Sequence, residues 1–193
     1  MDGGTEALQA AIAGFVHAGD TVLDVGAGPS SCYRSIIVAK ARELILLDAH
    51  APYLELAFRG LGKSPRLTAT TAGKCIVRKE LIDARTMAME RWEQRKIDVA
   101  LAIDFIEHLE KTEALALIPK LLVVAGRGVA LFVPEGDHPQ NRDHFGLGGD
   151  YWQTHRSSWR AGELEELGFV VERWPNFHEG MRSPGALWGR WLR

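Results

Sequence analysis

The sequence predicts an α/β protein built on a mostly parallel sheet, and three patterns support that prediction. Short, continuously apolar runs recur along the chain, as expected for strands that are covered on both faces. Segments with apolar residues at helical spacing separate these runs, which favours right-handed crossovers between parallel strands. Close to the end of the chain only a loop joins two strand-like segments, which requires antiparallel pairing.

The elements of the first part of the chain follow from hydrophobic spacing and turn residues. In order, they are a helix at 5–18, a strand at 21–28, a helix at 31–41, a strand at 43–50 and a helix at 51–62. Thr5 is the candidate cap of the first helix. The polar stretch 63–75 is interrupted by glycine and proline and predicts a loop.

The second part continues the alternation and then departs from it. In order, it predicts a strand near 75–82, a helix near 86–95, a strand over 96–104, a helix over 111–125, a strand over 128–136, a helix followed by a strand within 159–174, and a strand over 185–193. Gly126 and Gly128 are interpreted as the stop signal of the long helix. Seven strands are therefore expected, the last of them antiparallel.

Composition is that of an ordinary globular protein. The 193 residues fit a single domain, 1–193, and contain 46% hydrophobic and 25% charged residues. A net charge of −2 with no long basic run gives no reason to expect a nucleic-acid partner. Cys32 and Cys75 form no C-x-x-C motif. No signal peptide and no long apolar run are evident, so we expect a cytoplasmic protein without a membrane partner.

The first predicted strand carries an acid, Asp24, directly before a glycine turn. A buried carboxylate is costly unless donors satisfy it. Gly26 and Gly28 allow a tight turn and close approach of a ligand. Asp48 closes the second predicted strand, where a carboxylate can accept hydrogen bonds from a ribose. A dinucleotide is disfavoured, because Ser31 replaces the third glycine of G-x-G-x-x-G and Asp24 would repel a phosphate.

Together these motifs resemble the class I S-adenosylmethionine-dependent methyltransferases over essentially the whole chain. In that family an apolar strand ends in an acid and a G-x-G-x-G turn, and here Ser30 stands at the third glycine. The stretch AIDFIEHL, 102–109, resembles the family's D-x-x-E-H motif after the fourth strand. The resemblance implies a three-layer α/β/α Rossmann-like fold, with a seven-stranded, mostly parallel sheet and a C-terminal antiparallel strand.

The resemblance also implies S-adenosylmethionine (SAM) as cofactor and S-adenosylhomocysteine (SAH) as product. Asp24 would lie near the methionine ammonium, partnered by the ligand or by amides of the glycine turn. Asp48 would bind the ribose and Asp83 the adenine amino group, although helix capping by Asp48 stays open. The residues expected to bind the cofactor are Asp24, Gly26, Ala27, Gly28, Asp48, Ala49, Asp83, Ala84 and Asp104.

Methyl transfer is an in-line displacement that mainly requires alignment, and an alcohol or amine acceptor can also require a general base. Asp104 would serve as that base, orient the substrate or cap the following helix. The expected catalytic residues are Asp104, His108 and His155, and the expected substrate-binding residues are Glu107, His108, His144, Tyr151 and Trp152. The last three of these lie in a long insertion, 135–159, whose Trp159 is expected to pack against the last helix.

A metal-assisted alternative comes from enzymes that methylate the 2′-hydroxyl at the 3′ end of small RNAs. They bind a divalent ion through E-x-x-E-H and a later histidine. Asp104, Glu107 and His108 match that pattern with Asp at the first position, and His144 or His155 offers a fourth ligand suited to Mn²⁺ or Fe²⁺. Metal-free family members share the Glu-His pair, so no metal is assigned.

The leading hypothesis is a methyltransferase that modifies an O, N or C atom of a small molecule. Methylation of RNA or protein is an alternative, and it would require a basic face. A non-catalytic SAM-binding subunit is another alternative, which the retained glycine turn and acid disfavour. The stretch 104–107, DFIE, in place of D/N-P-P-Y/F argues against methylation of nucleic-acid amino groups.

Overall fold

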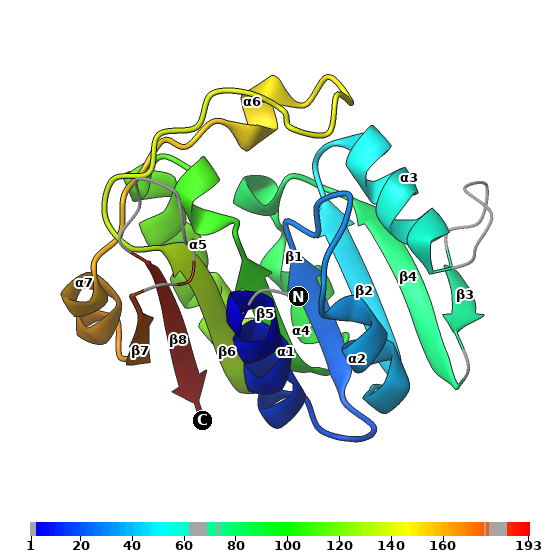
Figure 1. Ribbon diagram of the computed structural model, residues 1–193. Helices are drawn as coiled ribbons and strands as arrows, with labels where there is room; N and C mark the ends of the chain where they lie inside the picture. Colours follow the sequence, from blue (N-terminus) through cyan, green and yellow to red (C-terminus); the bar gives the residue numbers. More distant parts are fainter. Residues whose placement is uncertain (1–2, 62–68, 73, 176, 178–184) are drawn as a thin grey trace.

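The computed structural model describes residues 3–61, 69–72, 74–175, 177 and 185–193. Its strands form one sheet in the order β3-β4-β2-β1-β5-β6-β8-β7. The strands are β1 Thr21–Val25, β2 Glu43–Asp48, β3 Ala69–Ala72, β4 Cys75–Leu81, β5 Ile97–Ile103, β6 Ala125–Pro134, β7 Val170–Trp174 and β8 Ala186–Leu192. From β4 to β6 the neighbours are parallel, whereas β8 is antiparallel to both β6 and β7. The predicted mostly parallel sheet with its antiparallel C-terminal strand is confirmed (Figure 1), but the described residues form eight strands where seven were predicted.

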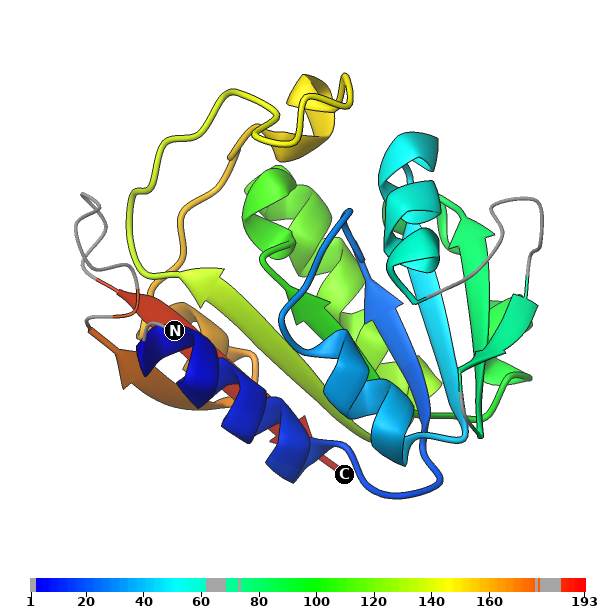
Figure 2. The ribbon, with the colours of Figure 1, turned by 45° about the vertical axis from the view of Figure 1, so that its right-hand side comes forward.

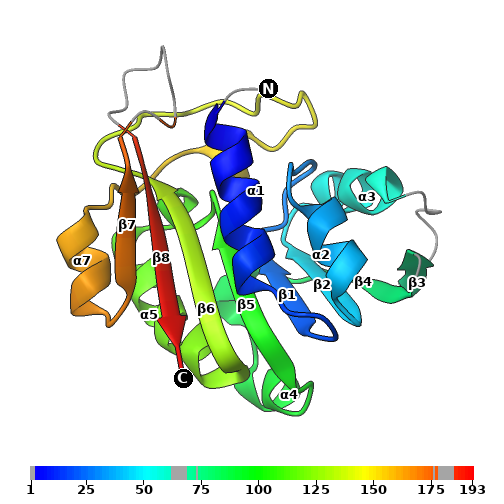
Figure 3. The same ribbon diagram turned by 60° about the horizontal axis from the view of Figure 1, so that its bottom comes forward.

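Helices cover both faces of the sheet, so the predicted three layers are confirmed (Figures 2 and 3). The helices are α1 Gly3–Phe15, α2 Arg34–Lys40, α3 Ala51–Gly60, α4 Met89–Glu93, α5 Lys111–Val124, α6 Asp150–Gln153 and α7 Ala161–Glu166, with short 3₁₀ turns η1 Ala84–Thr86 and η2 Ile106–His108. One apolar core lies under α1, α2 and α3 and includes Ile12, Ile37 and Phe58. The other lies under α4, α5 and α7 and includes Trp92 and Leu164.

Two local differences from the expected elements have physical causes. Part of the predicted loop 63–75 is the strand β3, which forms an antiparallel pair with β4; its two threonines are β-branched and favour a strand, and the rest of that loop, apart from Lys74 and Cys75, lies outside the described residues. Gly126 and Gly128 do not end a helix before a turn, because β6 begins directly after α5. A Cβ on Gly128 would lie 2.6 Å from the Trp191 carbonyl oxygen, so the glycine permits close strand contact.

The carboxyl ends of the five parallel strands meet at one edge of the sheet. The segment that follows β6 crosses this edge, carries the short helix α6 and reaches α3, as Figure 1 shows. We call residues 137–156 of this segment the lid. It brings residues far along the chain over the strand ends that carry the predicted motifs. Among the described residues, no helix has the length and apolar character needed to cross a membrane.

Candidate active site

A pocket of about 360 Å³ lies under the lid, at the carboxyl ends of β1, β2, β4 and β5. Its wall combines the glycine turn after β1 with the residues that follow the other three strands. The lid supplies the opposite wall. Nearly all of the residues predicted from the sequence line it: Gly26, Ala27, Gly28, Asp48, Ala49, Asp83, Ala84, Asp104, Glu107, His108, His144, Tyr151, Trp152 and His155.

The glycine turn has the backbone conformation that glycine favours. Gly26 and Gly28 have φ values of 65° and 62°. At Gly26 there is a second constraint, because an added Cβ would lie 2.0 Å from Cδ2 of Phe105. The Phe105 ring therefore packs directly on the turn. Gly26 is needed for this contact as well as for any approach of a ligand to the backbone.

Asp24 is fully buried, and its partners are side chains of this chain. Arg34 Nε donates to Oδ2 at 3.1 Å, and the Tyr33 hydroxyl donates to Oδ1 at 3.0 Å. Burial raises the pKa of the Asp24 carboxyl, and Arg34 opposes this rise. Side chains, rather than amides of the glycine turn, therefore satisfy the Asp24 carboxylate, and its expected place near a ligand ammonium stays a prediction. Asp24 is not among the described residues that line the pocket.

Arg34 connects this buried pair to the glycine turn. Its Nη2 donates to the Gly28 carbonyl oxygen at 3.3 Å, while its backbone N–H bonds to the Ser31 hydroxyl. Asp24, inside β1, thus holds Arg34 in a position where it supports the glycine turn. Sequence reasoning missed Tyr33 and Arg34, although a cation at the start of the next helix is a suitable partner for a buried acid.

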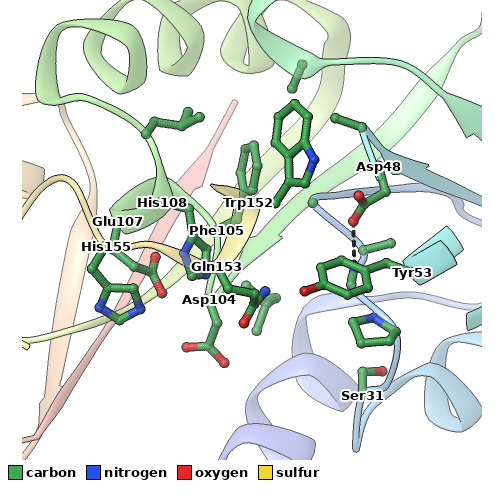
Figure 4. A pocket seen from close by; sticks show the side chains of 18 of the residues that line it. Ser31, Asp48, Tyr53, Asp104, Phe105, Glu107, His108, Trp152, Gln153 and His155 are labelled. Atoms are coloured by element: carbon green, nitrogen blue, oxygen red, sulfur yellow. Dashed lines mark hydrogen bonds between the residues drawn. The ribbon is translucent and has the colours of Figure 1, made fainter. Parts of the chain in front are cut away.

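Asp48 joins the turns that follow β1 and β2. Its Oδ2 accepts from the Gly28 N–H at 2.8 Å, the bond drawn in Figure 4, and its Oδ1 accepts from the His50 N–H at 2.8 Å. Burial raises the pKa of this carboxyl, although the two amides favour its charged form. Each oxygen of a carboxylate can accept a further bond. Asp48 is therefore placed to accept hydrogen bonds from a diol.

Asp83 has a local partner that the sequence analysis did not anticipate. Arg85 Nε contacts both carboxylate oxygens at 2.9 and 3.0 Å, and its Nη2 donates to Oδ2 at 2.7 Å. The Arg85 backbone N–H also donates to Oδ1, so Asp83 caps η1. The side-chain and backbone bonds from Arg85 lower the pKa of Asp83. The carboxylate is thus largely occupied by its own chain.

Asp104 occupies an unusual backbone position at the end of β5. Its φ is 49°, which is rare for a residue with a side chain and is often found at functional sites. The carboxyl is exposed to the pocket, yet the protein around it reduces its hydration enough to raise its pKa to about 7. A carboxyl with a pKa near neutrality can accept a proton at physiological pH.

Glu107, His108 and His155 come together at the same end of the pocket (Figure 4). One donor atom from each lies within 4.8 Å of the others. Glu107 Oε2 and His108 Nδ1 are buried and have no hydrogen-bond partner among the described residues. Burial and Asp104 raise the pKa of Glu107, whereas burial and His155 lower the pKa of His108 to about 4. His108 is therefore a neutral imidazole at physiological pH.

The lid is fixed to the body of the protein at its C-terminal end and near its tip. On one side, backbone N–H groups of Arg156 and Ser157 donate to the Glu107 carbonyl oxygen at 2.7 and 3.1 Å. On the other, His50 Nε2 bonds to the Leu147 carbonyl oxygen at 2.9 Å. Trp159 is fully buried in the core beside α7, as expected from the sequence. The lid therefore crosses the pocket from the residues that follow β5 to α3.

Gly149 makes the contact between the lid tip and α3 possible. A Cβ at this position would lie 1.9 Å from the Tyr53 hydroxyl oxygen and 2.3 Å from the ring atom that carries it. Phe145 packs against the same ring, with centroids 5.9 Å apart. The Asp143 carboxylate organises the tip by accepting N–H bonds from Phe145, Leu147 and Gly149. Tyr53, which lines the pocket, was not predicted as a site residue.

No protein-family model matches the chain, and no curated protein matches it in sequence. Solved structures do match in fold. Magnesium protoporphyrin IX methyltransferase from Synechocystis PCC 6803 with bound SAM is 16% identical, with a TM-score of 0.63, covering 98% of this chain and 77% of that one. The fold is that of the class I methyltransferases.

Two further methyltransferase structures extend this likeness. The methyltransferase domain of bacterial CtHen1 is 16% identical, with a TM-score of 0.60, and the match covers 99% of this chain and 96% of that one. The DhpI–SAH complex is 19% identical, with a TM-score of 0.64 and coverages of 97% and 80%. The methyltransferase fold thus confirms the resemblance inferred from the sequence at the level of architecture.

Proposed function

We propose that this chain is a SAM-dependent methyltransferase that acts on a small molecule. The proposal rests on one pocket whose two ends have different chemistry. The glycine turn and Asp48 form one end, and Asp104, Glu107, His108 and His155 form the other. Neighbours with the same fold were solved with SAM or SAH bound, which supports a cofactor at the corresponding strand ends.

The residues of the first end fit an adenosyl cofactor. Gly26, Ala27 and Gly28 present backbone to the pocket, so the amino-acid part of a ligand can approach closely. Asp48 would accept hydrogen bonds from the ribose hydroxyls. Asp24 would act indirectly, by holding Arg34 against the turn. SAM supplies an electrophilic methyl group on its sulfonium.

The second end would align an acceptor and take its proton. Asp104 lies at the end of β5, and its pKa of about 7 makes it a suitable general base. In such a transfer the acceptor O or N would bond to the methyl carbon as the carbon–sulfur bond breaks, and Asp104 would take the acceptor proton. His108, neutral because of its lowered pKa, would hydrogen-bond the acceptor.

The lid and the charges of the pocket favour a small acceptor over RNA or protein. The lid covers the strand ends and packs on Tyr53, which encloses the pocket. Among the described residues that line it, the two arginines are already engaged. Arg85 binds Asp83 and Glu113, and Arg156 donates to the carbonyl oxygens of His108, Thr154 and Tyr151. Binding of the phosphates of RNA would need cationic side chains that are not already bonded within the protein.

Ligand-dependent melting of the purified chain tests this proposal. SAM and SAH should raise the melting temperature in proportion to the logarithm of their concentration, whereas NAD should not. Transfer of labelled methyl from SAM to a library of alcohols, amines and acids then identifies the acceptor class. Stabilisation by NAD without stabilisation by SAH would contradict the proposal.

A metal-assisted reaction is a second candidate, and the cluster at the acceptor end favours it. One carboxylate and two imidazoles, with Asp104 nearby, are donors that suit Mn²⁺ or Fe²⁺. Within the described part of the chain, Glu107 Oε2 and His108 Nδ1 are also buried without hydrogen-bond partners. A divalent ion held by Glu107, His108 and His155 would polarise an acceptor hydroxyl. The likeness of the fold to the small RNA methyltransferase HEN1, with a TM-score of 0.64 at 16% identity over 24% of that chain, makes a 2′-hydroxyl acceptor worth testing.

Calorimetric titration with Mn²⁺ separates the two candidates. If the ion is part of the site, the wild-type chain should bind one equivalent and His155→Ala should bind much more weakly. His144→Ala is the matched control, because His144 lines the pocket but stands outside the cluster. Equal affinity in wild type and His155→Ala, or activity that is insensitive to chelators, would exclude the metal-assisted reaction.

A further inference from the structure

The lid reaches both ends of the pocket within a few residues. The Trp152 ring centroid lies 5.6 Å from Cζ of Arg85, which is anchored on Asp83 after β4. The His155 ring lies 4.8 Å from the ring of His108, after β5. In the sheet, β2 and β1 stand between β4 and β5. Trp152 therefore lies toward the nucleoside side of the pocket, and His155 lies at the acceptor side (Figure 4).

The pocket wall on the β4 side is suited to a flat apolar ring. Ala49, which follows β2, and Ile82 and Ala84, which follow β4, line the pocket, as does Trp152. The Asp83 carboxylate there is already bonded to Arg85 through side chain and backbone, so it has little capacity left for an adenine amino group. Recognition by surface contact thus fits this corner better than recognition by that carboxylate.

We propose that the Trp152 indole stacks on the adenine of the cofactor and that this contact holds the lid in its observed position over the pocket, with His155 beside Glu107 and His108. The inference rests on the proposed function, since it needs an adenosyl ligand in this pocket. It gives Trp152 a different role from the acceptor contact expected from the sequence. It also couples the lid to the cofactor, because one short segment contacts the adenine through Trp152 and supplies His155 to the acceptor end.

Hydrogen bonds around α6 connect Trp152 to His155, so a contact that fixes Trp152 would also fix His155. The Thr154 N–H donates to the Asp150 carbonyl oxygen at 3.0 Å, which ties the turn that carries Trp152 to the residue before His155. The His155 N–H donates to the Gln140 carbonyl oxygen at 2.9 Å, and Gln140 Nε2 donates to the Gln153 carbonyl oxygen at 2.8 Å. Residues 150–155 therefore form one hydrogen-bonded unit that can move together.

Calorimetry with adenosine and with SAH tests the stacking contact. Trp152→Ala should weaken both ligands by about the same factor, roughly tenfold, because base–aromatic stacking is lost and nothing else in the ligand is affected. Trp152→Phe is the matched variant, and it should recover most of the affinity because it keeps an aromatic face. Unchanged adenosine affinity in Trp152→Ala would overturn the proposal and return Trp152 to the acceptor side.

Hydrogen exchange tests the coupling. In the wild-type chain SAH should slow amide exchange across residues 150–157, and in Trp152→Ala at saturating SAH this protection should be lost. Equal protection in both proteins would overturn the coupling. A wild-type chain that binds neither adenosine nor SAH would contradict the proposed function itself, whereas normal SAH binding with no effect of Trp152 contradicts only this inference. Quenching of wild-type fluorescence by SAH that persists in Trp152→Phe would also contradict it.

Discussion

Asp24 and Asp104 are two acids of adjacent parallel strands, β1 and β5, with opposite surroundings. Asp24 is enclosed by Tyr33 and Arg34 and supports the glycine turn through them. Asp104 faces the pocket from a strained backbone position, and its pKa is raised to about 7. One acid is therefore part of the frame of the site, while the other is available for chemistry.

The buried pair Asp24–Arg34 predicts a strong effect on stability. Arg34→Met should lower the free energy of unfolding by about 3–5 kcal/mol, because it leaves a buried charge without its partner. The double variant Asp24→Leu, Arg34→Met should recover part of this loss. Urea denaturation measures both values. A single variant as stable as the wild type would show that the ion pair does not hold the turn.

Asp48 predicts an effect on binding. Asp48→Ala should weaken SAH by a factor that corresponds to about 1.5–3 kcal/mol, since charge-assisted hydrogen bonds to the ribose are lost. Asp137→Ala, at an exposed lid position, is the control and should leave the affinity unchanged. Calorimetry at constant ionic strength gives both constants. The ribose assignment fails if the two variants bind SAH equally well.

The raised pKa of Asp104 predicts how its removal changes stability with pH. In the folded protein the pKa of this carboxyl is about 7, whereas an Asp carboxyl in an unfolded chain has a pKa of about 3.9. The folded state therefore binds more protons between these values, and Asp104 lowers stability as the pH rises through that window. Asp104→Asn should raise the melting temperature more at pH 8 than at pH 5. The opposite order would show that the pKa of the Asp104 carboxyl is not raised.

At the scale of elements, the lid is the feature that most changes what the strand ends can do. It carries His144, Tyr151, Trp152 and His155 to the pocket and rests on α3 through a glycine that tolerates no side chain. Closure of such segments excludes water and completes catalytic sites. The lid therefore connects the fold to the chemistry.

Gly149→Ala should loosen the lid tip, because the new methyl group would collide with the Tyr53 ring. Amide exchange over residues 143–150 should become faster, with the sheet unaffected. Gly162→Ala in α7 is the control, since a Cβ there meets no atom of the described residues within 4 Å. If exchange at the tip is the same in wild type and Gly149→Ala, the tip does not depend on this contact.

The sequence predicted most elements because their signals are local. Apolar runs located β1, β2, β5 and β6, and the loop-only connection correctly required antiparallel pairing of β7 and β8. The strand β3 was not recognised, since a short polar strand at a sheet edge has neither alternation nor length. The start of β6 was misplaced because a glycine that permits close packing looks like a glycine that ends a helix.

The candidate site was predictable in its members but less so in its partners. The strand-end acids and the glycines lie in the pocket as the motifs imply, with the exception of Asp24. Its bonds to Tyr33 and Arg34, and the bond of Asp83 to Arg85, depend on side-chain directions that residue spacing does not specify. The approach of His155 to His108 depends on the path of the lid, which no local pattern encodes.

At the scale of the whole molecule, the parallel sheet brings the ends of β4, β2, β1 and β5 side by side, in an order unlike their order along the chain. Residues separated by many positions thus share one pocket at the edge where the strand order reverses. The nucleoside end and the acceptor end are then set by which strands lie next to each other. This arrangement supports transfer of a group from a bound cofactor to a second molecule.

A crystal structure of the chain grown with SAH would locate the cofactor site. We expect SAH in the pocket between the glycine turn and the lid, with its ribose hydroxyls on Asp48 and its sulfur facing Asp104. SAH bound elsewhere on the chain, or a pocket without SAH at saturating concentration, would show that this pocket is not the cofactor site.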